Sequence, residues 1–189
     1  MSLLLEPHKT AVLTLDLQRG VFGILTNAAE SIIPLASRAT QFARDNNYHL
    51  FHVGLGFSPG HPEIKDGDSA FADLKTHGMF LVGSDSAQVH PSIAEPNEPV
   101  IHKQRFCAFS ENALHLILRS KGIENLVLFG AITSGVVLST LRRAYDLDYN
   151  CNILKDACFD PDAEVHRILT DKIFAAQAKV LAVSEFTSA

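Results

Sequence analysis

Two side chains of opposite charge, each following a predicted strand, could carry out acid–base chemistry in this sequence. Asp16 follows the apolar run at 10–15, and Lys103 follows a short run at 100–102. An ammonium group beside a carboxylate helps to keep it ionised, and the carboxylate can then move a proton to and from a substrate. A structural ion pair at a sheet edge explains the same positions equally well, so position alone leaves both interpretations open.

Alternating strands and helices must bring these two side chains together. The run TAVLTL at 10–15 has no polar alternation, which is typical of a strand buried on both faces of a parallel sheet. The pattern predicts a parallel sheet with helices on both faces, in which ligands bind beyond the carboxyl ends of the strands. The further strands are expected at 48–55, 100–102, 125–129, 151–154 and 179–183, and the longer helices at 28–46 and 134–147.

Helix-end residues give further boundaries. Ser110 could cap a helix that turns Leu114 and Leu118 inward and that ends at Gly122. Asp160 followed by Pro161 predicts the start of another helix. The irregular stretch at 56–98, with a short helix near 69–76, is expected to be a functional loop or an oligomer contact.

The turn after the strand at 125–129 adds a third point to the crevice. Thr133 and Ser134 lie there, and parallel strands end at the same sheet edge, so we expect both residues to lie near Asp16 and Lys103. Backbone N–H groups at 133–136 are candidates for binding a developing negative charge.

Four segments carry a more specific pattern, and together they resemble the isochorismatase-like hydrolase superfamily, also called the cysteine hydrolases. The resemblance implies one domain over residues 1–189. Its fold would be a three-layer α/β/α Rossmann-like arrangement with a mainly parallel six-stranded sheet in the order 3-2-1-4-5-6. It also implies that Asp16 and Lys103 are catalytic. The segments are TAVLTLDLQRGVF at 10–22, HKQRFCAF at 102–109, NLVLFGAITSGVVLSTLRRAYDLDY at 125–149 and ILKDAC at 153–158.

The chain departs from this family at the nucleophile. The family pattern Gly-x-x-Thr-x-x-Cys falls on Gly130, Thr133 and Val136, so valine stands where the thiol is expected. Valine cannot attack a carbonyl or form a thioester, which places covalent amide hydrolysis in doubt. The isochorismatases of the family instead use the Asp to protonate a vinyl ether carbon before water adds, and this is the chemistry we expect. The family also implies a cis peptide bond between Ala131 and Ile132.

No metal or other cofactor is carried over from the resemblance. Nicotinamidases of the family hold a metal through Asp-x-His after the second strand, whereas this chain has His52, Val53 and Gly54 there. The remaining histidines show no HExxH or comparable spacing.

The substrate pocket is expected near the same sheet edge, with alternatives open for several of its residues. Cys107 could be a displaced nucleophile beside Lys103 or a packed thiol, and Ser134 could bind substrate or cap a helix. The phenylalanines of the set could wall the pocket or belong to the core. The candidate pocket residues are Gln18, Phe22, Phe106, Cys107, Phe109, Ile132, Thr133, Ser134 and Val136.

Composition excludes several other classes of function. The formal net charge is -5 and no Lys/Arg cluster is present, which argues against a nucleic-acid-binding protein. No run approaches the roughly 20 apolar residues of a membrane span, and the start carries no basic leader. The three cysteines lack CxxC spacing, which suits a reducing compartment, so we expect a cytoplasmic protein.

Two hypotheses remain for the function. The first is a hydrolase of a small, cyclic or carboxylated metabolite, which forms a homodimer or larger homo-oligomer through residues 56–98. The second is a non-catalytic small-molecule-binding or scaffold protein of the same fold. A tight crevice with Asp16 and Lys103 within hydrogen-bond reach favours the first hypothesis, and a crevice filled by Val136 and its neighbours favours the second.

Overall fold

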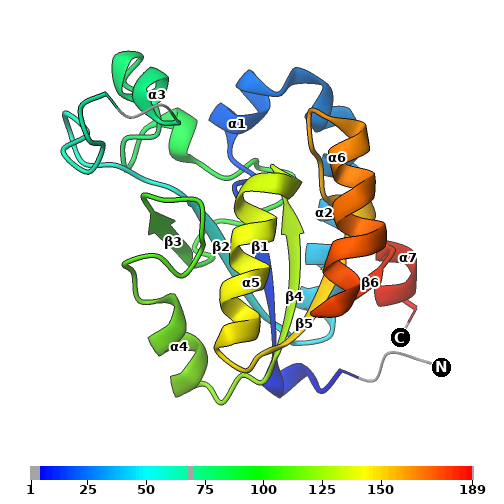
Figure 1. Cartoon of the computed structure of the whole chain (residues 1–189). Coiled ribbons are helices and arrows are strands. Elements are labelled where there is room, and N and C mark those ends of the chain that lie inside the picture. The colour runs from blue at the N-terminus through cyan, green and yellow to red at the C-terminus, as the bar shows by residue number, and fades with distance from the viewer. Residues whose placement is uncertain (1–4, 68–69, 189) are drawn as a thin grey trace.

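A six-stranded sheet forms the centre of the computed structural model, which describes residues 5–67 and 70–188 (Figure 1). Every strand pairs in parallel with its neighbour, and the order is β3-β2-β1-β4-β5-β6, which confirms the predicted fold. The strands are β1 (Thr10–Leu15), β2 (His49–Leu55), β3 (Val100–Lys103), β4 (Asn125–Gly130), β5 (Asn150–Leu154) and β6 (Ala178–Leu181).

Helices cover both faces of this sheet. In Figure 1, α5 crosses in front of β4 while α2 lies behind it. The predicted helices at 28–46 and 134–147 are confirmed as α2 and as a π-helical turn at Thr133–Val137 that continues into α5. The helices are α1 (Arg19–Ile24), α2 (Thr26–Asp45), α3 (Ala72–Thr76), α4 (Leu114–Ser120), α5 (Leu138–Asp146), α6 (Ala163–Ile168) and α7 (Val183–Phe186).

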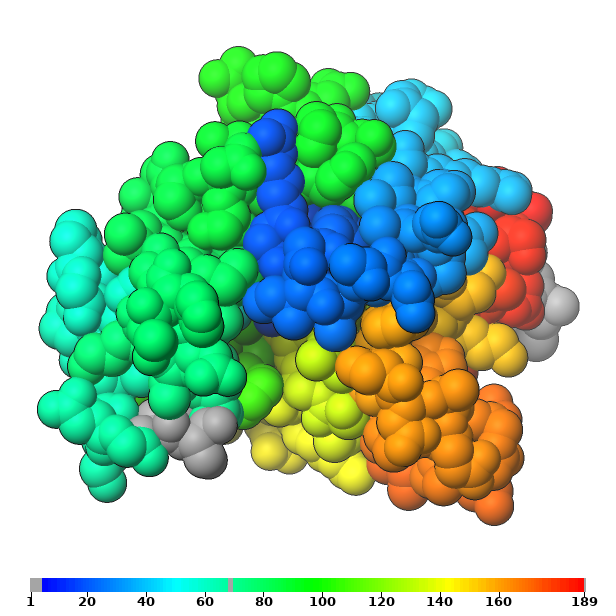
Figure 2. Space-filling model, turned by 90° about the horizontal axis from the view of Figure 1, so that it is seen from above, coloured from blue at the N-terminus to red at the C-terminus, as the bar shows by residue number. Residues whose placement is uncertain are grey.

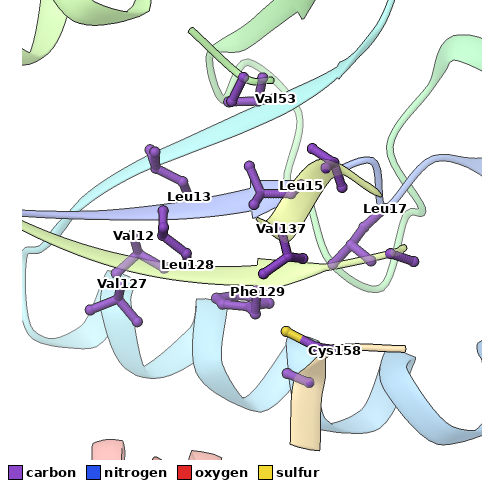
Figure 3. Packing of buried hydrophobic residues seen from close by; sticks show 14 of the residues in the cluster. Val12, Leu13, Leu15, Leu17, Val53, Val127, Leu128, Phe129, Val137 and Cys158 are labelled. Atoms are coloured by element: carbon purple, nitrogen blue, oxygen red, sulfur yellow. The ribbon is translucent and has the colours of Figure 1, made fainter. Parts of the chain in front are cut away.

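The apolar core lies on both faces of the two central strands. All six residues of β1 are buried, as are the last five of β4, because each of these strands has a strand on either side and helices above and below. Figure 3 shows Val12, Leu13 and Leu15 of β1 against Leu128 and Phe129 of β4. The apolar run at 10–15 is therefore unbroken because both faces of β1 are covered, as its pattern predicted.

Two of the predicted helix caps are wrong. Helix α4 begins at Leu114, whose N–H donates to the Asn112 side chain at 2.9 Å, so Ser110 lies too early in the chain to cap it. Helix α6 is capped by Asp162, which accepts from two backbone N–H groups of the first turn, whereas Asp160 turns away to another loop. The predicted end of α4 at Gly122 is confirmed, with φ of +66° and an N–H bond to Arg119 O.

The described residues of 56–98 form a lobe at the carboxyl end of the sheet. Figure 2 looks onto this end and shows the lobe, coloured cyan to green, beside α1 in blue, with α5 and α6 on the other side. The predicted short helix is confirmed as α3, although residue 69 lies outside the described residues.

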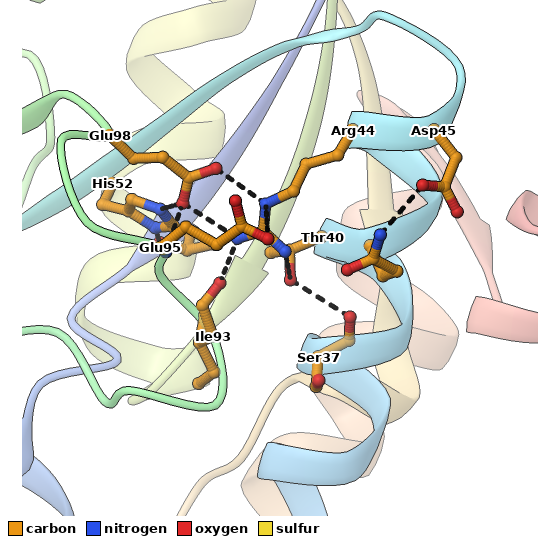
Figure 4. A network of polar contacts seen from close by, with 10 residues as sticks. Ser37, Thr40, Arg44, Asp45, His52, Ile93, Glu95 and Glu98 are labelled. Carbon is orange, nitrogen blue, oxygen red and sulfur yellow. Dashed lines mark hydrogen bonds and ion pairs between the residues drawn. The ribbon is translucent and has the colours of Figure 1, made fainter.

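Buried polar groups fasten the lobe to the sheet. Glu98 accepts two hydrogen bonds from Arg44 of α2 and one contact from the buried His52 of β2 at 2.9 Å (Figure 4). His52 in turn contacts Thr14 of β1 at 2.7 Å.

Within residues 5–67 and 70–188, no helix is both long enough and apolar enough to cross a membrane.

Candidate active site

Asp16 and Lys103 meet at the carboxyl edge of the sheet. β1 and β3 both pair with β2, so the residues that end them emerge on the same side. Lys103 Nζ donates to Asp16 Oδ2 at 2.9 Å and to Arg105 O at 2.9 Å. Lys103 is 1% exposed and Asp16 is 7% exposed, so the pair is almost completely withdrawn from solvent.

Burial dominates the electrostatics of the Asp16 carboxyl group. Burial raises the pKa of Asp16 above its ordinary value of 3.8, and the Lys103 ammonium only partly opposes this effect. Asp16 Oδ1 is buried and has no hydrogen-bond partner among the described residues, whereas Oδ2 is held by Lys103. A buried carboxyl group with a raised pKa is suited to carry a proton.

The pair lies in a cavity of about 150 Å³. Its wall is formed by the ends of strands, by α1, by the lobe and by the turn after β4. Among the described residues, only Asp16 and Lys103 bring polar side chains to it. The other lining residues are Val21, Ile24, Leu25, Leu55, Ala70, Phe71, Leu74, Phe80, Phe106, Ala131, Ile132, Gly135 and Val136.

Three of the nine predicted pocket residues line this cavity, namely Phe106, Ile132 and Val136. Val136 is buried but forms only part of the wall, so the cavity beside the ion pair remains open. The predicted residues that do not line it are Gln18, Phe22, Cys107, Phe109, Thr133 and Ser134.

Gln18 and Phe22 stabilise the structure around the site instead. The Gln18 amide donates to Leu55 O and Ala87 O and accepts from Leu55 N, so it joins β2 to the lobe. Phe22 packs its ring edge-on against His90, with centroids 5.6 Å apart. An amide whose donors and acceptor are already engaged offers little to a substrate.

Cys107 and Phe109 lie at a different hollow, of about 350 Å³, which is lined also by Arg142 and Arg143 of α5. Phe109 stacks on Tyr149 with centroids 6.0 Å apart. The Cys107 thiol is therefore not placed to attack a ligand bound beside Asp16.

The turn after β4 also differs from the prediction. The Thr133 N–H donates to Phe159 O at 2.8 Å and the Ser134 N–H donates to Asp160 Oδ2 at 2.8 Å, so neither is available to an anionic ligand. The Thr133 hydroxyl contacts His166 Nδ1 at 2.9 Å. Of the N–H groups at 133–136 that we expected to form an anion site, those of Thr133 and Ser134 are thus engaged elsewhere. The predicted cis bond between Ala131 and Ile132 is present.

Most of the apolar wall was missed from the sequence. Phe71, Leu74 and Phe80 come from the lobe, and Val21 and Leu25 come from α1 and the residue after it. A signal did exist, because apolar residues recur at 71–80 within a stretch otherwise rich in Gly and Asp. Nothing in the sequence distinguishes a pocket wall from an oligomer contact at these positions.

The hollow at the other edge of the sheet has fewer charged groups among the described residues. A larger hollow of about 500 Å³ lies at the opposite edge, where it is lined by Asn125 and Asn150, the first residues of β4 and β5. Lys179 is the one charged residue that lines it within the described chain. No group of three or more His, Cys, Asp or Glu side chains that could hold a metal occurs in the described ranges.

Comparison with known proteins agrees with this fold. The isochorismatase domain model matches residues 10–185. YecD of Escherichia coli O157:H7, an isochorismatase family protein, is 30% identical over 190 residues, which cover 98% of each chain. The ureidoacrylate amidohydrolase RutB of Azorhizobium caulinodans is 28% identical over 79% of this chain and 76% of its own. The cysteine hydrolase structure from Pseudomonas syringae pv. phaseolicola superposes with a TM-score of 0.87 at 18% identity, over 97% of this chain and 93% of that one.

Proposed function

The chain belongs to the isochorismatase family, and from this premise we propose that it hydrolyses a small metabolite by acid–base chemistry at Asp16 and Lys103, without a cysteine nucleophile. The observation that carries the proposal is the buried 2.9 Å contact between the two side chains at an open cavity. The amidohydrolase name of the RutB relative supports a hydrolase as the class of enzyme.

The proposed reaction starts from protonated Asp16. The carboxylic acid donates its proton to a substrate carbon, as in vinyl ether hydrolysis, and water adds to the cation that forms. That water returns a proton to the Asp16 carboxylate, and the resulting hemiketal collapses to a carbonyl compound and an alcohol, so the net change is the addition of one water. Lys103 stabilises the carboxylate form, and its third N–H, beyond the two that bond Asp16 and Arg105 O, can orient the substrate.

A mechanism without sulfur is supported by the positions of the cysteines. By the resemblance of 130–136 to the family motif, Val136 takes the position of the nucleophile, and the Val136 side chain lines the cavity. Burial raises the pKa of both Cys151 and Cys158 to about 12, so both stay as inert thiols near neutral pH. Cys107 lies at the separate hollow beside α5.

A non-catalytic scaffold protein is the alternative, and two observations weigh against it. A cavity of about 150 Å³ remains beside the ion pair instead of being filled by Val136. A buried charge pair also stabilises a fold little more than apolar residues of the same volume would, so stability alone gives little reason to keep it.

The proposal is tested by turnover in a screen of vinyl ethers, amides and isochorismate. We expect Asp16→Asn to reduce kcat by a factor of about 10³, because asparagine keeps the shape and cannot supply the proton. Cys107→Ala is the matched control and should retain wild-type turnover. Activity that survives Asp16→Asn, or that disappears in Cys107→Ala, would remove the acid–base mechanism in favour of a thiol route.

A further inference from the structure

The wall of the cavity limits what kind of molecule can bind beside Asp16. We infer that the substrate is uncharged where it enters this cavity, and that its buried part is a mainly apolar group about the size of one six-membered ring. The inference deepens the proposed function and rests on it only in taking the ligand of this cavity to be the substrate.

While Asp16 is ionised, the charges of the described residues at the site leave no unpaired cation for an anionic substrate. In this form the Asp16 carboxylate and the Lys103 ammonium neutralise each other at 2.9 Å, and every other described side chain that lines the cavity is apolar. The nearest further cation in sequence, Arg105, does not line the cavity, and its guanidinium donates to Gln104 O and Glu63 O. A substrate carboxylate would therefore lose its hydration and meet the Asp16 carboxylate without a compensating positive charge.

The size of the cavity sets the second limit. Its volume is about 150 Å³, and an apolar cavity of roughly this volume accommodates a benzene molecule. Phe71, Phe80 and Phe106 come from three different places in the chain and supply aromatic surface to the same wall. Phe71 and Phe106 lie with ring centroids 5.1 Å apart, so this part of the wall is closely packed.

The rim has the same character as the interior. Ile24 and Phe106 both line the cavity and remain 55% and 46% exposed. Large apolar side chains that are half exposed at the entrance of an apolar cavity favour an apolar group of the ligand over water. The polar chemistry is thus confined to the deep end, where Asp16 and Lys103 lie.

Benzamide and benzoate test the inference, because they share a shape and differ in charge. We expect benzamide to bind the wild-type protein in calorimetry at a pH above the raised pKa of Asp16, where the ion pair is intact, and benzoate to bind about 100-fold more weakly or not at all. Calorimetry measures binding without turnover, so it tests the inferred substrate class alone. The acid–base mechanism is tested separately, by the kinetics of Asp16→Asn.

Two glycines provide a matched pair of variants that locate the binding. A Cβ at Gly135 would lie 3.4 Å from Phe106 and 3.7 Å from Ile132, so Gly135→Ala adds a methyl group inside the cavity without a backbone clash. A Cβ at Gly23 of α1 meets nothing within 4 Å, so Gly23→Ala makes the same change in open space. We expect Gly135→Ala to weaken benzamide binding about 10-fold and Gly23→Ala to leave it unchanged.

Three results would overturn the inference. Benzoate could bind as tightly as benzamide, benzamide could fail to bind, or benzamide binding could be insensitive to Gly135→Ala. The first would mean that the site accepts an anion, and the other two that a neutral ring does not enter this cavity.

Discussion

The two oxygens of Asp16 have different surroundings, and this difference defines the site at the scale of the residue. Oδ2 accepts from Lys103, whereas Oδ1 is buried without a hydrogen-bond partner among the described residues. A proton on the carboxyl group is therefore expected on Oδ1, since Oδ2 already faces an ammonium group. The catalytic roles of Asp16 and Lys103 remain predictions.

The pH dependence of turnover follows from this pair. Because protonated Asp16 is the proposed acid, turnover should fall as pH rises through its raised pKa. Lys103→Met removes the charge that lowers this pKa, so the falling limb of the pH–rate profile should move to higher pH while the maximal rate drops. If the falling limb of Lys103→Met stays in place or moves to lower pH, a group other than Asp16 sets the pH–rate profile.

At the scale of the element, the turn between β4 and α5 depends on a carboxylate from a distant loop. Asp160 is buried, and it accepts hydrogen bonds from Ser134 N at 2.8 Å and Asp162 N at 3.2 Å. It thereby fixes the start of the segment that presents Ile132 and Val136 to the cavity. We expected Asp160 to cap α6. Asp162 is the cap instead, because its carboxylate accepts hydrogen bonds from the N–H groups of Glu164 and Val165 in the first turn of the helix.

The variant Asp160→Ala tests this arrangement. It should lower the free energy of unfolding by about 1–2 kcal/mol, the loss typical of a removed cap, and should also lower kcat because the cavity wall shifts. Asp162→Ala is the matched control, which should cost similar stability in urea denaturation and leave kcat unchanged. Equal kcat values for the two variants would show that Asp160 has no specific role at the site.

At the scale of the whole molecule, the cavity exists only because the lobe at 56–98 is held over the sheet. The network of Arg44, Glu98 and His52 ties the end of the lobe to α2 and β2 (Figure 4). Burial alone would raise the pKa of Glu98, but hydrogen bonds from Arg44 and His52 outweigh it and lower that pKa well below 4.5. Assembly into a dimer through this lobe and a cytoplasmic location stay predictions.

Glu98→Gln should lower the free energy of unfolding by about 2–3 kcal/mol, because Arg44 loses a charged partner in a mostly buried place. In the wild type, this stabilisation is complete above the ordinary pKa of 4.5 and is lost as pH falls from there toward the lowered value in the folded state. Glu95, which is exposed and 3.7 Å from Arg44, provides the control, since Glu95→Gln should change stability by less than about 1 kcal/mol. Equal losses in the two variants, or the same acid sensitivity in Glu98→Gln as in the wild type, would contradict this account.

The sequence by itself predicted the parallel sheet and the meeting of Asp16 with Lys103, and the order of the strands came from the family resemblance. The sheet and the meeting follow from short-range patterns, since apolar runs mark buried strands and parallel strands end at a common edge. Boundaries of short elements were less accessible, as α1 shows, because its six residues contain two glycines and too few turns for a helical period.

Only the tertiary structure decided which side chains form the cavity. Gln18 and Phe22 lie close to Asp16 in sequence, yet their side chains pack against the lobe, while Phe71 and Phe80, far away in sequence, reach the cavity. The direction in which a side chain points after a strand end depends on the loop that packs over it. No local pattern records how that loop folds back, so the meeting of Asp16 and Lys103 could be predicted from the sequence and the apolar wall around them could not.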